Sequence, residues 1–220
     1  VITAISPAHT EKLGTLADVL EEKGKIFCRH STADHWMVLN ADDPLLRSLS
    51  QNTAACVMLF GMSADAHVQA RDITQRLAFR DDRPYDSGLR CTIAFGSESV
   101  RAEFPHIIGT HVLSSVLSAV AVGCIYHIPL QKIIDQLSHY VPPRSRMRPI
   151  PGIKGTLIID DSYNSSPKAA QGALDVLSLY EIGEGARRIA VLGDMRELGE
   201  ISEREHNDIG AYAGEKNIDM

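Results

Sequence analysis

The stretch Leu157-Ile158-Ile159-Asp160-Asp161-Ser162-Tyr163-Asn164-Ser165-Ser166-Pro167 decides the fold class of this 220-residue chain. An apolar run ends in two carboxylates, and a short polar loop leads to a Ser-Pro pair. Ser166 can cap a helix and Pro167 suits its first position, and apolar residues then recur at helical spacing over residues 170–177. In an open α/β sheet, such a loop follows the carboxyl end of a strand, where ligands bind. The spacing alone leaves open whether the loop binds a ligand or is a turn with solvated acids.

A second unit of the same kind follows along the chain. Residues 188–192 are predicted to form a buried strand, and residues 193–199 form an acidic loop that contains glycine. Ser202 then starts a predicted helix, with Glu205 three residues later as the partner of a capping box. Two consecutive strand–loop–helix units predict a parallel, doubly wound sheet and therefore the α/β class.

The composition is that of an ordinary globular protein. Hydrophobic residues make up 44% and charged residues 23% of the chain, and no apolar run approaches the roughly 18 residues of a membrane helix. A net charge of −6 gives no electrostatic reason to expect nucleic-acid binding. The four cysteines have neither zinc-finger nor redox spacing. We therefore expect a cytoplasmic protein with reduced thiols, no membrane insertion and no nucleic-acid partner.

The two loops carry a resemblance to a known family. The segments IIDDSYNSSPKAA (residues 158–170) and VLGDMRELG (residues 191–199) resemble the C-terminal domain of the Mur ligases. They are most similar to the branch that adds D-alanyl-D-alanine to UDP-N-acetylmuramoyl-tripeptide. Because earlier segments also match, the resemblance extends over essentially the whole chain.

The resemblance implies two partial domains. Residues 1–142 would belong to the central ATP-binding domain, with a mixed sheet and helices and a truncated N-terminus. Within it, the more polar residues 66–104 are predicted to form an antiparallel appendage. Residues 143–220 would form the first half of a Rossmann-like, doubly wound C-terminal domain. The chain begins without methionine in a strand-like pattern and ends in another, so we expect a fragment of a longer protein.

The resemblance also implies the chemistry. Members of the family make an amide bond at the expense of ATP, with Mg²⁺ as cofactor, in peptidoglycan precursor synthesis. A substrate carboxylate becomes an acyl phosphate, and the amine of D-alanyl-D-alanine then displaces phosphate. Both steps build negative charge on oxygen atoms, which fixed cations stabilise.

Two residues near the start of the chain are candidates for catalysis and metal binding. Lys23 lies beside the apolar stripe of a helix predicted over residues 13–27. It is either a lysine that reaches along the stripe to water or a desolvated amine that can react with carbon dioxide. The resemblance favours the amine, because residues 6–27 match a family segment that holds a metal-ligand histidine and a carbamylated lysine. These positions are His9 and Lys23, and a carbamate offers the oxygen atoms that Mg²⁺ prefers.

The remaining candidates would bind the nucleotide. Residues 141–149, which we call the hinge segment, are rich in proline and arginine and are predicted to form a stiff linker. The resemblance places Arg146 of this segment on the nucleotide, together with Asp161, Tyr163 and Asn164, and it assigns a ribose hydroxyl to Asp161. His111 matches a nucleotide-binding position, but it is equally suited to capping or packing at the start of the next helix.

Several positions depart from the family pattern. Ala4, Val112 and Ser115 stand where the family has asparagines, which leaves weakened nucleotide binding open. The segment Asn40-Ala41-Asp42-Asp43-Pro44 also resembles the family, but Asp43 and Pro44 fully satisfy the chemistry of a helix start, so we interpret this segment as structural.

A phosphate-binding loop of the form Gly-x₄-Gly-Lys-Ser/Thr is missing from the printed sequence. We therefore expect the fragment itself to be inactive and the longer parent to be the ligase. Two alternatives remain: another ATP-dependent ligase of the superfamily, such as a folylpolyglutamate- or cyanophycin-synthetase relative, and a non-catalytic interaction protein on the same scaffold, since one fold hosts many functions.

Overall fold

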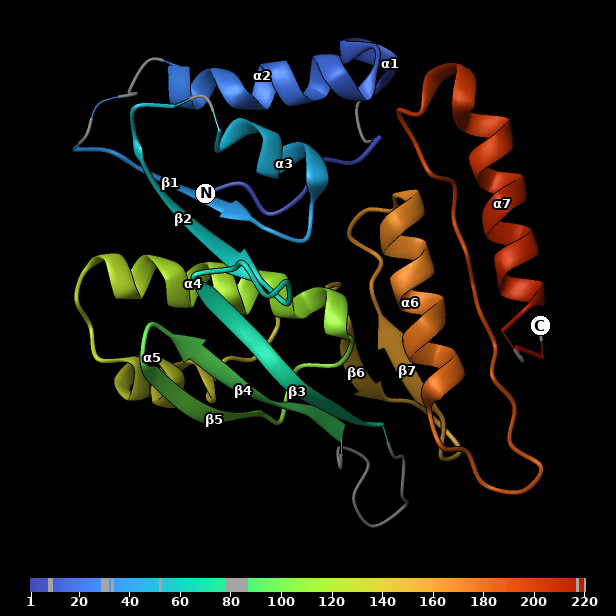
Figure 1. Cartoon of the computed structure of the whole chain (residues 1–220). Helices are drawn as coiled ribbons and strands as arrows, with labels where there is room; N and C mark the ends of the chain where they lie inside the picture. The colour runs from blue at the N-terminus through green and yellow to red at the C-terminus, as the bar shows by residue number, and fades with distance from the viewer. Residues whose placement is uncertain are drawn as a thin grey trace.

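The computed structural model describes residues 1–7, 10–28, 32, 34–51, 53–77, 87–216 and 218–219. A mixed five-stranded sheet with helices on both faces forms the first part of the chain, and a hairpin with two long helices forms the second (Figure 1). The strand order is β1-β2-β3-β4-β5, with β1 (Trp36–Asn40), β2 (Cys56–Gly61), β3 (Val68–Leu77), β4 (Ser87–Phe95) and β5 (Glu98–Phe104). The predicted α/β class is confirmed.

The sheet changes direction at β3. The strands β1 and β2 run parallel, and β2 pairs in parallel with β3 only at Phe60–Val68 and Gly61–Gln69. The longer strands β3, β4 and β5 then form an antiparallel meander. The polar strands predicted as an appendage are thus antiparallel, but they continue the same sheet. The predicted strand at residues 1–5 is reduced to a single parallel bridge between Ile2 and Leu39.

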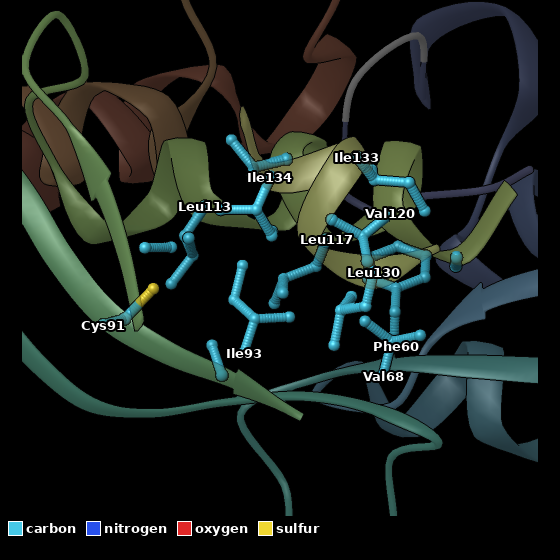
Figure 2. Close-up of a cluster of buried hydrophobic side chains, with 14 of the residues drawn as sticks. Phe60, Val68, Cys91, Ile93, Leu113, Leu117, Val120, Leu130, Ile133 and Ile134 are labelled. Carbon is cyan, nitrogen blue, oxygen red and sulfur yellow. The ribbon is translucent and has the colours of Figure 1, made fainter. Parts of the chain in front are cut away.

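One face of this sheet packs against α4 (Leu113–Ile125) and α5 (Leu130–Leu137). Figure 2 shows the side chains of both helices pointing toward those of the strands. Burial of each such side chain contributes roughly 1.5–3 kcal/mol. The largest fully buried side chains of this cluster are Phe60, Leu89, Ile93, Phe104, Ile107, Leu113 and Leu117.

The other face of β1 and β2 packs against α2 (Leu16–Cys28) and α3 (Pro44–Leu49). Successive strand residues point to opposite faces, so Met37 and Leu39 contact this layer while Val38 contacts α4 and α5. The single helix predicted over residues 13–27 is instead two helices, because Gly14 adopts a left-handed φ of 93° between α1 (Thr10–Leu13) and α2.

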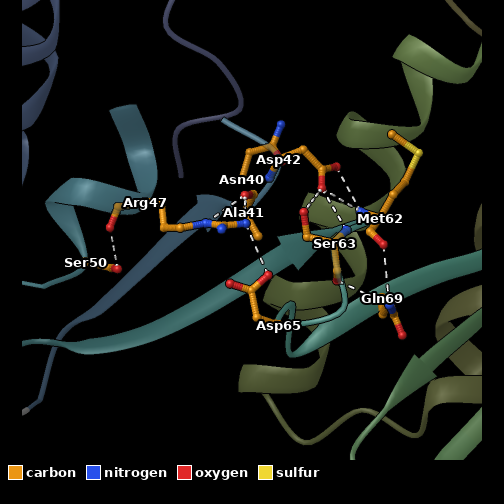
Figure 3. Close-up of polar contacts among 9 residues, drawn as sticks. All are labelled: Asn40, Ala41, Asp42, Arg47, Ser50, Met62, Ser63, Asp65 and Gln69. Carbon is orange, nitrogen blue, oxygen red and sulfur yellow. Dashed lines mark hydrogen bonds and ion pairs between the residues drawn. The ribbon is translucent and has the colours of Figure 1, made fainter. Parts of the chain in front are cut away.

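The segment after β1 is a polar network with structural partners (Figure 3). Asn40 donates to the carbonyl of Thr3, and Asp42 accepts from the backbone and hydroxyl of Ser63. Asp43, only 5% exposed, caps α3 and also accepts from the backbone N–H of Ile5 at 2.8 Å. The carboxylates of Asp42 and Asp43 thus have structural hydrogen-bond partners, as expected from the structural role predicted for residues 40–44.

The second part of the chain begins with the antiparallel hairpin of β6 (Arg148–Pro151) and β7 (Leu157–Asp160). The helix α6 (Pro167–Leu179) follows with Ser166 as its N-cap and proline in its first turn, as predicted. The 3₁₀ turn η2 (Gly199–Ile201) then leads into α7 (Ser202–Gly214). The helix begins at Ser202 as predicted, but its cap residue is Ile201 without a side-chain bond, so the capping box was wrong.

The predicted buried strand at residues 188–192 was also wrong. Val191 is 93% exposed, and no described strand pairs with this extended segment. A ladder-like contact occurs at its start, where the N–H of Asp219 donates to the carbonyl of Arg188 at 2.8 Å. A strand of apolar residues is buried only when neighbours cover both its faces. In the described ranges Ala190 packs against the core between α6 and α7, but Ile189, Val191 and Leu192 stay exposed. The parallel pairing expected for the doubly wound sheet is therefore not observed within the described ranges.

In the described ranges, hydrogen bonds join the two parts of the chain at two places. At the C-terminal end of α6, the Tyr180 hydroxyl donates to Ser87 Oγ at 3.2 Å and the N–H of Glu181 donates to the carbonyl of Leu77. At the other end, the N–H of Glu11 in α1 donates to the carbonyl of Glu197 at 3.2 Å. The predicted boundary at residues 142 and 143 falls in the irregular segment between α5 and β6 and stays a prediction. No helix in the described ranges is both long and apolar enough to cross a membrane.

We predict that Asp43→Ala lowers the free energy of unfolding by about 1–3 kcal/mol, because it removes a helix cap and leaves the N–H of Ile5 unpaired. Asp65→Ala is the matched control, because Asp65 makes only a surface ion pair with Arg47 in the same network, and it should cost less than about 1 kcal/mol. Urea unfolding followed by circular dichroism measures both. Equal losses for the two variants would contradict the structural role of Asp43.

Candidate functional site

The loop after β7 lies against the hinge segment. Asp160 Oδ2 accepts from the backbone N–H of Ser145 at 3.1 Å and from its hydroxyl at 3.3 Å. Asp161 Oδ1 accepts from the backbone N–H of Met147 at 3.0 Å. The N–H of Tyr163 donates to the carbonyl of Ser145 at 3.3 Å. The two adjacent carboxylates thus hold the backbone on either side of the residue between Ser145 and Met147.

That residue is Arg146, and its flanking backbone is unusual. Ser145 has a φ of 62° and Met147 a φ of 46°. The left-handed region costs a residue with a Cβ roughly 1–2 kcal/mol, so two such residues in a row of three require compensating bonds. The carboxylates of Asp160 and Asp161 supply those bonds.

The guanidinium of Arg146 lies over the ring of Tyr163, with its carbon 4.0 Å from the ring centroid. Tyr163 is 70% exposed and Arg146 is exposed as well. A stacked guanidinium keeps its in-plane N–H donors free for oxygen atoms of a ligand. Asn164 is exposed next to this pair, and its side-chain oxygen accepts from the backbone N–H of Ser165. Four of the predicted nucleotide-facing residues therefore lie together at the carboxyl end of β7.

The fifth, His111, joins this site from the first part of the chain. It lies in η1 (Thr110–Val112), with its ring edge directly beside the Cα of Gly172 in α6. Although part of the residue is exposed, loss of water around the ring lowers the pKa of His111, and the charges of Asp161 and Asp175 oppose this shift. The His111 ring thus packs against α6, and its predicted role at the nucleotide stays a prediction.

The two carboxylates at the end of β7 differ in their electrostatics. Partial burial raises the pKa of Asp161, while the N–H of Met147 and the charges of His111 and Arg146 act in the opposite direction. The hydroxyl of Ser162 lowers the pKa of Asp160, with help from its own N–H and from the N–H of Ser145. Hydrogen bonds therefore stabilise the carboxylate of Asp160, whereas burial outweighs the bonds and charges that favour the carboxylate of Asp161.

The second acidic loop, residues 193–199, lies toward the same end of the molecule, next to α1 (Figure 1). Met195 and Leu198 anchor it in the core between α6 and α7. His206 Nε2 accepts from the N–H of Met195 at 3.0 Å, while its Nδ1 lies 2.7 Å from the carbonyl of Ser202. These contacts require a neutral ring with the proton on Nδ1, so His206 fixes the loop rather than serving as a free acid or base.

Lys23 of α2 makes a hydrogen bond to the backbone of the segment before α1. Its Nζ donates to the carbonyl of Ala4 at 3.2 Å, and the residue is half-buried. His9 lies outside the described residues, so the predicted pair of His9 and Lys23 is not tested. Without a carbamate Lys23 offers no oxygen ligand to Mg²⁺, and no three acidic, histidine or cysteine side chains in the described ranges form a metal site. The described residues alone thus do not fit this ion.

The positions that depart from the predicted pattern have structural contacts. The carbonyl of Ala4 binds Lys23, and Val112 packs between the sheet core and the core around Met147. The carbonyl of Ser115 accepts from the hydroxyl of Ser118. None of these contacts supplies the hydrogen-bonding groups that an asparagine side chain would offer at the same position.

Comparison with known families decides the classification. The Mur ligase middle domain family matches residues 1–123, and the Mur ligase glutamate ligase domain family matches residues 145–220. This chain belongs to the Mur ligase family. The family resemblance predicted from the two acidic loops is therefore confirmed.

Individual Mur ligases match the chain over most of its length. It is 30% identical to the UDP-N-acetylmuramoyl-tripeptide–D-alanyl-D-alanine ligase of Bacillus subtilis over 220 residues, which is 100% of this chain and 44% of that protein. It is 33% identical to the UDP-N-acetylmuramoylalanine–D-glutamate ligase of Symbiobacterium thermophilum over 179 residues, which is 80% of this chain and 37% of that protein.

Solved structures support the same classification. The structure of MurF from Acinetobacter baumannii superposes with a TM-score of 0.84 at 25% identity, covering 99% of this chain and 44% of that one. The chain thus spans less than half the length of these Mur ligases.

Sequence reasoning missed two residues of this site. Asp160 was noted only as part of an acidic pair, and Ser145 was not singled out. The contact between them joins positions 15 residues apart, which periodicity cannot reveal. The sequence does contain one usable signal. Two adjacent acids, Asp160 and Asp161, could pair in order with the backbone on either side of the arginine in Ser145-Arg146-Met147.

We predict a pH effect on stability from His111. Because its folded-state pKa is lowered, the unfolded chain binds more protons below the ordinary value near 6.5. The stabilising contribution is present above about pH 6.5 and is lost as the pH falls through that value toward the folded-state pKa. The melting temperature of His111→Gln should therefore fall less between pH 7.5 and pH 5.5 than that of the unchanged chain.

His106→Gln serves as the control, because His106 is an exposed histidine in the loop before η1. It should leave the pH dependence unchanged. If His111→Gln and His106→Gln show the same slope as the unchanged chain, the desolvated His111 ring does not govern this part of the profile.

Proposed function

We propose that the longer protein containing this chain is an ATP-dependent ligase that adds D-alanyl-D-alanine to UDP-N-acetylmuramoyl-tripeptide. The observation that carries the proposal is the convergence of Arg146, Asp161, Tyr163 and Asn164 at the carboxyl end of β7. This is the end of a strand where α/β proteins bind ligands. The match of the whole chain to 44% of the length of ligases named for this substrate supports it. A reaction that consumes ATP belongs in the cytoplasm, where we place the protein.

In this proposal each residue of the hinge site has a defined task; we use this name for Arg146, Asp161, Tyr163, Asn164 and His111. The guanidinium of Arg146 donates to phosphate or ribose oxygens of ATP, for which its planar fork is suited. Asp161 keeps Oδ1 on the N–H of Met147 and offers Oδ2 to a ribose hydroxyl. Tyr163 and Asn164 border the nucleotide, and His111 joins the two domains beside it.

The reaction we propose proceeds in two steps. The tripeptide carboxylate attacks the γ-phosphate of ATP and releases ADP, which leaves an acyl phosphate. The neutral amine of D-alanyl-D-alanine then attacks the acyl carbon, phosphate leaves, and an amide bond forms. The hinge residues contribute by fixing the nucleotide against the acceptor and by excluding water when the domains close.

Lys23 and His9 complete the proposed site on the other side. A carbamate on Lys23, with the imidazole of His9, would provide ligands for Mg²⁺, whose chemistry is to neutralise charge on phosphate oxygens. The half-buried position of Lys23, bonded to a backbone carbonyl rather than to an acid, supports a reactive amine.

A second candidate is the addition of D-glutamate to UDP-N-acetylmuramoylalanine. The 33% identity to a ligase of that name over 179 residues favours it, although that match covers less of the chain. The two candidates differ in their amine acceptor, so one assay separates them.

We predict that the full-length protein releases phosphate from ATP only when both D-alanyl-D-alanine and UDP-N-acetylmuramoyl-tripeptide are supplied. Replacing these by D-glutamate and UDP-N-acetylmuramoylalanine should give no release above background. The 220-residue chain alone should be inactive, because its sequence lacks a phosphate-binding loop. Release with D-glutamate would establish the second candidate, and absence of both release and ATP binding in the full-length protein would indicate a non-catalytic relative.

We further predict that Lys23→Arg in the full-length protein lowers kcat by at least about 100-fold, because arginine keeps the charge but cannot form a carbamate. Lys25→Arg is the control on the same helix, since Lys25 makes only an exposed ion pair with Glu22. It should retain activity within about twofold. Normal turnover by Lys23→Arg would show that Lys23 has no more than a packing role.

A further inference from the structure

The hinge segment contains an arrangement that the proposed reaction does not by itself require. Ser145 is held at every polar atom, because Asp160 accepts from its N–H and hydroxyl and the N–H of Tyr163 donates to its carbonyl. On the other side of Arg146, Met147 is held by Asp161. Both held residues are left-handed, with φ of 62° and 46°. The conformation of Arg146 is therefore fixed from both sides by consecutive carboxylates.

Asp160 is occupied on both oxygens. Oδ2 accepts from Ser145, and Oδ1 accepts from the N–H of Ser162 at 3.2 Å and from its hydroxyl at 2.6 Å. The hydroxyl of Ser162 also lies 3.2 Å from that of Ser145. A carboxylate with this set of donors has little capacity left for a ligand, which distinguishes it from Asp161.

From these contacts we infer that Asp160 is a positioning residue for Arg146. It acts through Ser145, whose left-handed backbone it stabilises, and thereby keeps the guanidinium stacked on Tyr163 before the nucleotide arrives. The inference rests on the proposed function, in which Arg146 binds ATP, and it adds a residue that does not touch the nucleotide.

The physical reason is conformational. A serine without these bonds prefers negative φ, and a change of φ at Ser145 swings the following residue away from Tyr163. Arg146 would then populate many orientations, and only a fraction would be competent to bind. Apparent affinity falls in proportion to that fraction, whereas the chemical step is unchanged once the nucleotide is bound.

The test uses the full-length protein with the variant Asp160→Ala. We expect the KM for ATP to rise about tenfold while kcat changes less than about threefold. Amide hydrogen exchange at Ser145 and Met147 should become faster in the same variant. Asp42→Asn is the matched control, because Asp42 also accepts from the N–H and hydroxyl of one serine, Ser63, and it should lower thermal stability without changing the KM.

Two changes at Ser145 test the conformational step directly. Glycine adopts positive φ without penalty, so Ser145→Gly combined with Asp160→Ala should bring the KM back to within about threefold of the unchanged enzyme. Proline fixes φ near −65°, so Ser145→Pro alone should reproduce the KM of Asp160→Ala. A purely structural role would predict neither the rescue nor the mimicry.

The outcomes separate this inference from the proposed function. If the unchanged full-length protein neither binds ATP nor releases phosphate, the proposed function fails, and with it the role of Arg146. If the protein is active but Asp160→Ala leaves the KM for ATP within about twofold, or leaves exchange at Ser145 and Met147 unchanged, the positioning role of Asp160 is overturned.

Discussion

The bonds from Asp160 and Asp161 to the backbone of Ser145 and Met147 are the constraint on which the rest of the site depends. They connect the end of β7 to the segment that enters the hairpin, and they compensate for left-handed backbone at two residues with side chains. Arg146 then has one defined direction, toward Tyr163. The loop that first suggests a ligand site is thus also the element that shapes the hinge.

The first part of the chain provides the surface against which this hinge site is placed. Alternation along β1 and β2 sends side chains to two different cores, so helices cover both faces of these strands. Ile108 and Val112, which precede α4, then pack with Met147 and Val176 in a smaller core that belongs to both parts of the chain. Because this small core includes a residue of the hinge segment, packing between the domains and the conformation of the hinge are coupled.

What could be predicted from the sequence was local. The start of α6 at Ser166 and Pro167 and the start of α3 at Asp43 and Pro44 follow from cap chemistry within four residues, and both are observed. The family assignment also came from contiguous segments. The strand at residues 188–192 was wrong because burial of a strand depends on neighbours that its own sequence does not specify.

The parts of the site that escaped prediction depend on contacts between distant segments. Nothing near Lys23 shows that its amine meets the carbonyl of Ala4, and nothing near Asp160 shows that it holds Ser145. Propensity and periodicity describe single elements, whereas these bonds arise when elements pack. His206 is similar, since its tautomer is set by a loop 11 residues earlier.

The absence of a side chain at Gly172 has a consequence for how closely the two domains approach. A methyl group there would lie 2.9 Å from His111 Nδ1 and 3.1 Å from its ring carbon Cγ, nearer than atoms normally come. Any larger residue would act as a wedge between α6 and η1. The spacing between α6 and η1 therefore depends on the absence of a side chain at Gly172, and a single added carbon would be enough to widen it.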